Sequence, residues 1–450
     1  MAVTDWWLGK NGSDWATVIC RSNATATVTV TCNGRDFTGS ADTSVNDGIV
    51  EITVTGLTDT RVAYSVDGVA GGTLRAKKSR GPYWVASGSC WSKVRPDMLA
   101  YALLRDYDLD AYFALGDFPY CNTGSTALGE TTVNVTSSIA NATNASNYLA
   151  HHRQQRRVPG IKELMRSVPF VYMADDHEYM VDNARRDLDW WQNNPAAAES
   201  QPTATAQNLT DAWAAARAAI EAYATGNPVN ADAGIDSDAL YTRFTVGPAE
   251  FFLLDCINYG TRPDAADDAS KTMLGASQKA WLIAAILAST ATFKVIVSPK
   301  QFWRGGTNTD AWHAHGINPG YQTELKEILY AIRSVTGVMA VAGDQHRYSD
   351  QFVAAGDLGA GYPAMSCFVG CPTTVDPNPT SYVGYDSQIV MRDNGRNTGP
   401  TSREDFAVAL LKISDTTVER YLLTTLRGLI PLGYIEAGSN DVQYARPKIG

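Results

Sequence analysis

Short apolar runs that end in acidic or metal-binding residues constrain this chain more than any other feature. The clearest is Tyr112–Tyr120, YFALGDFPY, in which an uncharged run stops at Gly116-Asp117. Such runs are typical of strands buried on both faces of a parallel sheet. Open α/β sheets place their sites at the carboxyl ends of such strands. The sequence therefore predicts Asp117 at such an edge, with a simple turn aspartate as the alternative for one isolated case.

Three further predicted strands end in residues that can bind metals. The predicted strand Tyr83–Ser87 is followed by Ser89-Cys90, and Val168–Ala174 is followed by Asp175-Asp176-His177-Glu178. The third, Val338–Ala342, is followed by Asp344 and His346. Turn chemistry explains single aspartates, but it does not explain two histidines and a cysteine at equivalent positions. We therefore expect these strand ends to form a metal site.

The residue types suggest two different ions. Two metal ions roughly 3.5–4 Å apart can neutralise a phosphoester and orient it for hydrolysis, and a carboxylate such as Asp117 can bridge them. A thiolate, a phenolate and an imidazole together favour a redox-capable transition metal such as iron, whereas carboxylates favour Ca²⁺, Mg²⁺ or Mn²⁺. Cys90, Tyr120 and His346 thus point to a site different from one made of Asp117, Asp176 and Asp344.

The first 80 residues predict an all-β domain. Ala24–Cys32 and Ile49–Thr55 alternate between apolar and polar residues, Val62–Val66 is a third short strand, and Asn33-Gly34 is a hairpin signal. Since 450 residues exceed one ordinary core, we expect two domains: an Ig-like β-domain over 1–80 and a catalytic domain over 81–450.

Strands alternate with helices after residue 80, which is typical of an α/β fold. The predicted helices are Pro96–Asp106, Ala150–Arg166, Thr210–Thr225, Ser277–Ser289 and Tyr321–Arg333. His151 and His152 stand beside three arginines and predict an exposed basic face. Cys20 and Cys32 flank an alternating strand and would be able to form a disulfide in an oxidising compartment.

Charge and hydropathy narrow the class of partner. The formal net charge is -10, which argues against nucleic acid as a ligand, because proteins that bind nucleic acids present basic surfaces. The sequence predicts no transmembrane span and no signal peptide, and it leaves the compartment and the oligomeric state open.

Seven motifs together resemble PhoD-type alkaline phosphatases of the calcineurin-like metallophosphoesterase superfamily. In chain order they are GSC (88–90), GDFPY (116–120), DDHE (175–178), LLD…R (253–262), MLGASQKAWL (273–282), DAW (310–312) and GDQH (343–346). The resemblance implies a four-layer αββα sandwich behind an N-terminal Ig-like domain. It also implies phosphomonoesterase or phosphodiesterase activity at alkaline pH.

The same resemblance implies roles for individual residues. An iron ion would be held by Cys90, Asp117, Tyr120 and His346, and Ca²⁺ would be held by Asp117, Asp176 and Asp344, with Mn²⁺, Mg²⁺ or Zn²⁺ as alternatives. A metal-bound hydroxide would attack phosphorus in line. His177, paired with a neighbouring acid, would protonate the leaving group, and Asp175 and Glu178 would orient the ligands.

The sequence departs from the family pattern in two motifs. The Asn-Asn pair that follows DDHE in the family is altered here to Asp182-Asn183, and the expected Asp-x-Arg reads Asp255-Cys256-Ile257. Arg262 or Arg304 would then clamp the phosphate. Two other functions stay open: a phosphodiesterase or phosphotriesterase acting on lipids or polymers, and a non-catalytic surface or virion binding protein on the same fold.

Overall fold

In the computed structural model, the chain folds into two compact units. One unit comprises residues 1–80 and 92–228, and the other comprises 81–91 and 229–450. The structure describes residues 2–91, 104–180, 184, 186, 188–193, 201–232, 235, 239–304, 310–314, 320–344, 349–353, 360–369, 389–392, 407–424 and 428–444. The assignment of 1–80 and 81–450 as separate domains stays a prediction.

The N-terminal strands of the first unit form two antiparallel sheets. The first sheet is β1 (Val3–Asn11), β2 (Trp15–Ser22) and β5 (Ile49–Thr55); the second is, in spatial order, β4 (Arg35–Ala41), β3 (Ala26–Cys32), β6 (Val62–Val66) and β7 (Val69–Leu74). Asn33 and Gly34 join β3 to β4 with φ angles of 52° and 71°, as a tight hairpin requires. The predicted strands and hairpin of this all-β region are confirmed.

Side chains from both sheets share one apolar core. Val18 and Ile52 from the first sheet pack with Val30 and Val66 from the second, because alternate residues of each strand point inward. Cys20 and Cys32 belong to this core as free, buried thiols, so the disulfide suggested by their spacing is not formed. Burial raises the pKa of both thiols, which keeps them protonated and unreactive.

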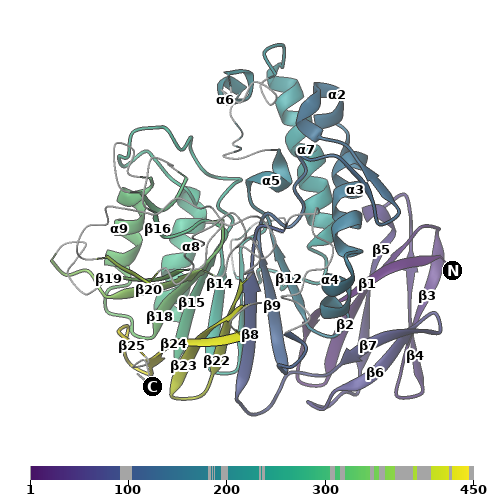
Figure 1. Cartoon of the computed structure of the whole chain (residues 1–450), viewed down its shortest axis with the longest axis horizontal. Helices are drawn as coiled ribbons and strands as arrows, with labels where there is room; N and C mark the ends of the chain where they lie inside the picture. Colours follow the sequence, from purple (N-terminus) through teal and green to yellow (C-terminus); the bar gives the residue numbers. More distant parts are fainter. Residues whose placement is uncertain are drawn as a thin grey trace. The chain divides into compact units, whose positions relative to one another are not determined.

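The α/β part of the first unit is built on two parallel strands. In β9 (Leu109–Leu115) and β12 (Phe170–Met173), Leu115 pairs with Met173 at the carboxyl ends, so the residues that follow both strands leave the same sheet edge. The remaining elements of this unit are η1 (Asn46–Gly48), β10 (Ser125–Ala127), β11 (Glu130–Thr132), η2 (Val135–Ser137), α2 (Ile139–Ala142), α3 (Ala145–Arg156), α4 (Pro159–Met165), α5 (Asp176–Tyr179), α6 (Leu188–Asn193) and α7 (Ala206–Tyr223). Helices α3 and α7 pack side by side (Figure 1).

Two predicted helices of this unit have different bounds. The segment predicted as one helix over 150–166 is two helices, because Pro159 begins α4 and forces Val158 out of the helical region. Helix α7 begins one turn earlier than predicted, where the Thr205 hydroxyl accepts a hydrogen bond from the Asn208 amide. The predicted helix Pro96–Asp106 lies largely outside the described residues.

The polar face of α3 is buried, contrary to the prediction of an exposed basic surface. Arg156 is 2% exposed, donates to His152 Nδ1 and to the Tyr223 carbonyl, and lies over the ring of Trp7. Burial lowers its pKa to about 10. His151 is also buried and donates to a backbone carbonyl. These hydrogen bonds give several of the polar groups partners within the protein, which is how a polar sequence can line a core.

The second unit contains a sheet with four neighbouring parallel strands. Its spatial order is β13 (Thr242–Val246), β14 (Ala249–Leu253), β15 (Phe293–Ser298), β18 (Val338–Ala342), β20 (Met365–Val369), β19 (Ser349–Val353) and β21 (Ile389–Arg392), of which β14, β15, β18 and β20 run parallel. Helices α8 (Gly275–Ala288) and α9 (Gln322–Ala331) supply the crossovers (Figure 1). Both helices were predicted within two residues of their ends.

An antiparallel set of strands completes the second unit. Strand β8 (Tyr83–Gly88) pairs with β22 (Ala407–Ile413), followed by β23 (Thr417–Thr424), β24 (Gly428–Glu436) and β25 (Val442–Tyr444). A short parallel pair joins β16 (Trp303–Arg304) to β17 (His313–Ala314). The architecture is thus a mixed α/β fold with an N-terminal all-β region. Among the described helices, none is long and apolar enough to cross a membrane.

Asp47 links the N-terminal sheets to the helices of the first unit. Its carboxylate accepts two hydrogen bonds from Arg21, further ones from Arg153 on α3, and one from the Tyr223 hydroxyl on α7. Although burial raises the pKa of Asp47, the bond from Arg21 and the charge of Arg153 lower it below its ordinary value. One carboxylate therefore pairs with two arginines, of which Arg153 also pairs with Glu130.

We expect Asp47→Asn to lower the free energy of unfolding by about 2–3 kcal/mol, because Arg21 loses its counter-charge and Arg153 keeps only its ion pair with Glu130. Asparagine tolerates the left-handed backbone at this position, where φ is 55°. Since the folded-state pKa is lowered, the stabilisation is present above about pH 4 and is lost as the pH falls. The wild type and the variant should therefore converge below pH 4 in thermal melts. An equal difference at every pH would contradict this role, and Asp36→Asn in the exposed β3–β4 hairpin is the control.

Candidate metal centre

Three predicted metal ligands share an unusual backbone conformation. Cys90, Asp117 and Asp344 have φ angles of 60°, 51° and 64°, and each lies two residues past the end of a strand. The left-handed region is costly for residues other than glycine, and such residues cluster at functional sites. The same strain at the same offset therefore marks these positions as more than ordinary loop residues.

The loop that carries Asp117 is held by close packing and by a buried carboxylate. A Cβ atom on Gly116, which has a φ of 81°, would lie 2.4 Å from Asp175 Cβ, so only glycine fits there. Glu178 accepts hydrogen bonds from the amides of Asp117 and Phe118 at 2.9 and 2.7 Å. The strained conformation of Asp117 is thus stabilised by a residue from the neighbouring strand's loop.

Glu178 also fixes the loop on its own side. Its carboxylate accepts the Asp175 amide at 3.0 Å, directly before α5. Burial raises the pKa of the Glu178 carboxyl to about 8, with the charge of Asp176 adding to the rise and the three backbone amides opposing it. Asp175 and Glu178 are both fully buried. Their arrangement orients the loops that carry Asp117 and Asp176.

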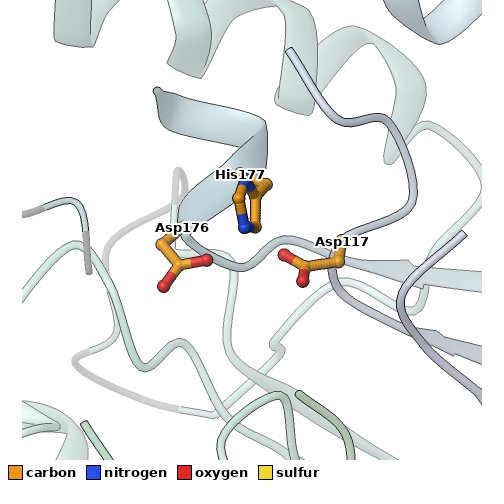
Figure 2. A group of neighbouring side chains, drawn as sticks. All are labelled: Asp117, Asp176 and His177. Atoms are coloured by element: carbon orange, nitrogen blue, oxygen red, sulfur yellow. The ribbon is translucent and has the colours of Figure 1, made fainter. Parts of the chain in front are cut away.

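Asp117, Asp176 and His177 come together at the carboxyl ends of β9 and β12. One potential ligand atom from each lies within 4.8 Å of the others, and Figure 2 shows the two carboxylates and the imidazole facing one another. Asp117 is 1% exposed and Asp176 is fully buried. Two buried carboxylates this close repel each other unless a cation lies between them, so this donor set fits a divalent metal ion.

Tyr120 belongs to the same group of side chains. Its hydroxyl donates to Asp117 Oδ2 at 3.1 Å, and its ring centroid lies 4.4 Å from that of His177. The phenol is therefore beside a carboxylate predicted to bridge two metals. Its role as an iron ligand stays a prediction.

The partner at Nδ1 of His177 differs from the expected acid. The ring nitrogen lies 3.1 Å from Asn122 Oδ1, and because an amide oxygen only accepts, Nδ1 is the donor. Nε2 is then the nitrogen that gains or loses a proton. No motif marked Asn122, which follows the GDFPY segment and becomes relevant only through the fold.

In the second unit, Ser89 connects two further predicted ligands. Its hydroxyl accepts the Asp344 amide at 3.1 Å and lies 3.3 Å from the fully buried Cys90 Sγ. Arg262 donates two hydrogen bonds to Asp264, at 2.9 and 2.8 Å, so its guanidinium is engaged by a carboxylate. His346 and Asp182-Asn183 lie outside the described residues, as does the side chain of Arg304.

Comparison with known proteins identifies the family. Residues 83–399 match the PhoD-like phosphatases, so the chain belongs to the PhoD-like phosphatase family and is a phosphoric ester hydrolase. The fold is similar to a solved structure described as that of PhoD, with a TM-score of 0.70, 18% identity, and coverage of 98% of this chain and 91% of that chain. At this identity, the likeness shows the fold alone.

Two further solved structures are only weakly similar to this chain. The protein TT1561 of Thermus thermophilus has a TM-score of 0.30 and 10% identity over 65% of this chain and 91% of that chain. A Vps29 mutant from Entamoeba histolytica has a TM-score of 0.25 and 9% identity over 78% of this chain and 98% of that chain. No curated protein matches the sequence.

We expect Glu178→Gln to disturb the centre without removing a ligand. Glutamine offers one oxygen to three amides, so the Asp117 loop loses part of its support and stability falls by about 2 kcal/mol. Metal content, measured by elemental analysis, should fall together with the melting temperature. Glu163→Gln, at an exposed position of α4, is the matched control. A Glu178 variant with normal metal content would argue against this supporting role.

Proposed function

We propose that this chain is a metal-dependent phosphomonoesterase or phosphodiesterase. The observation that carries the proposal is the group of Asp117, Asp176 and His177 at adjacent strand ends in a member of the PhoD-like phosphatase family. A phosphate ester is anionic and resists nucleophiles, so a hydrolase needs positive charge at the site of attack. Buried carboxylates provide it indirectly, by binding cations.

The residues that would hold the metals follow the motifs. Cys90, Asp117, Tyr120 and His346 would bind iron; Asp117, Asp176 and Asp344 would bind Ca²⁺, with Mn²⁺, Mg²⁺ or Zn²⁺ as alternatives. When bound, these ions supply charge neutralisation for the phosphate oxygens and lower the pKa of a coordinated water. The assignments of Cys90, Asp344 and His346 rest on the motifs and on their order along the chain.

The surroundings of His177 support a role as a proton donor once the ring is protonated. Asn122 accepts the hydrogen bond from Nδ1, Tyr120 packs against the ring, and Nε2 is thereby presented for proton exchange. In the protonated state, Nε2 can donate to the leaving alkoxide, which matters most when that alkoxide is a strong base. Asn122 is neutral, so it orients the ring without adding a negative charge.

The class of phosphate ester that the enzyme hydrolyses is not fixed by these residues. Arg262, the candidate phosphate clamp, donates to Asp264 and is 33% exposed, so its role as a clamp stays a proposal. A diesterase or triesterase acting on lipids or polymers is therefore the second candidate. Retention of the carboxylate–imidazole group, together with family membership, speaks against a purely adhesive protein.

The N-terminal sheets support the finer assignment of an Ig-like domain. The strand orders β1-β2-β5 and β4-β3-β6-β7 give a three-stranded sheet facing a four-stranded sheet around one core. Two antiparallel sheets packed face to face with such crossed connections are typical of Ig-like sandwiches. The four-layer αββα core stays a proposal drawn from the family resemblance.

We expect Asp117→Ala to abolish hydrolysis of 4-nitrophenyl phosphate, with a loss of at least about 1,000-fold, because a shared ligand is removed. Elemental analysis should show iron and a second divalent metal in the wild type and a depleted variant. Asp264→Ala, which removes an exposed carboxylate, is the control and should keep both metals. Activity near that of the wild type in the Asp117 variant would refute the metal-dependent mechanism.

We expect His177→Ala to retain the metals but to slow the reaction selectively. Hydrolysis of an alkyl phosphate should fall about 100-fold, whereas 4-nitrophenyl phosphate, whose leaving group needs no proton, should be affected much less. Asn122→Ala should produce a smaller change with the same selectivity, because the ring loses only its orientation. Equal slowing of both esters would exclude the general-acid role.

A further inference from the structure

A buried lysine leaves the sheet of the second unit beside a predicted metal ligand. In the parallel pair β15–β18, Ser298 is in register with Ala342. Lys300 lies two residues beyond Ser298, and Asp344 lies two residues beyond Ala342. The register therefore places a cation and a carboxylate at the same step past two adjacent strands.

The lysine lies between two carboxylates. Lys300 Nζ is 3.1 Å from Asp310 Oδ2 and 3.7 Å from Asp344 Oδ1. The side chains of Lys300 and Asp310 are fully buried, and that of Asp344 is 10% exposed. A charge buried to this extent is retained only when it is paired, and here the pairing extends to a residue of the GDQH motif.

Hydrogen bonds hold this lysine in a rigid loop. The Ser298 hydroxyl donates to the Lys300 carbonyl at 2.6 Å and accepts Trp312 Nε1 at 3.1 Å. The Trp312 amide in turn donates to the Gln301 carbonyl at 3.0 Å. The loops that carry Lys300 and Asp310 are thus fastened together, which fixes the backbone from which the lysine side chain extends.

We propose that Lys300 is a positioning residue that acts through Asp344 and sets the metal affinity of the centre. The ammonium group engages Oδ1, which directs metal binding to Oδ2. It also offsets one negative charge beside the ligand, so the metal is held less tightly than by the carboxylates alone. Asp310 opposes this effect by neutralising the lysine. The inference rests on the proposed role of Asp344 as a metal ligand.

The alternative is that Lys300 and Asp310 only join two loops. A structural pair would weaken the protein and its metal site whichever partner was removed. An electrostatic role predicts opposite effects, because removing the lysine adds net negative charge near Asp344 and removing the aspartate adds net positive charge. The sign of the change in metal affinity separates the two explanations.

The test is calorimetric titration of Mn²⁺ and Ca²⁺ into the full chain stripped with a chelator. Lys300→Met should tighten binding by about tenfold or more, and Asp310→Asn should weaken it by a similar factor. The double variant, which removes both charges, should fall between them. Lys271→Met is the matched control, because Lys271 is 3% exposed but bound to backbone carbonyls, and it should leave the affinity within about twofold.

Weaker binding in both single variants, or unchanged binding in both, would overturn the proposal. If Lys300→Met fails to fold, the double variant, which removes both charges of the Lys300–Asp310 pair, should still bind more tightly than Asp310→Asn; equal affinities would overturn the proposal. Asp344→Ala separates this inference from the proposed function. Loss of metal binding in Asp344→Ala with no effect of Lys300→Met refutes the lysine role alone, whereas normal binding in Asp344→Ala refutes the ligand assignment on which it rests.

Discussion

The carboxylate of Glu178 is the interaction on which the candidate centre depends. It accepts three backbone amides from two loops that follow different strands, and two of those amides belong to the left-handed turn at Asp117. Without an acceptor, these buried amides would be unsatisfied, and the strained turn would lose the hydrogen bonds that stabilise it. This one carboxylate thus fixes the loops that carry Asp117 and Asp176 relative to each other.

The sequence predicts secondary structure best where buried residues recur at a regular spacing along the chain. The alternating strands of the N-terminal region, the apolar strands β9, β12, β15 and β18, and the helices α8 and α9 were predicted because their patterns reflect which face is buried. The prediction of an exposed face on helix α3 is wrong because its polar residues His152 and Arg156 are buried and hydrogen-bond to each other inside the protein. A polar pattern alone does not distinguish a solvated face from an internal network.

The local sequence pattern also predicts only part of the candidate metal centre. Asp117, Asp176 and His177 were expected to lie together because each follows a buried strand, and the structure places them as neighbours. Asn122 and Lys300 could not be recognised from the sequence as parts of the site, because an amide in a loop and a lysine after a strand are common. Their significance comes from the register of parallel strands and from loop packing, which are properties of the fold rather than of local sequence.

The pairing of β8 with β22 has a consequence for biosynthesis. Ser87 lies opposite Ala409, so a strand made early in synthesis finds this partner only when the last part of the chain has emerged. Until then, its apolar residues and backbone groups have to be shielded from other chains. Such non-local pairing slows folding. The yield of active protein should therefore be sensitive to growth temperature and to the supply of chaperones, more so than its final stability would indicate.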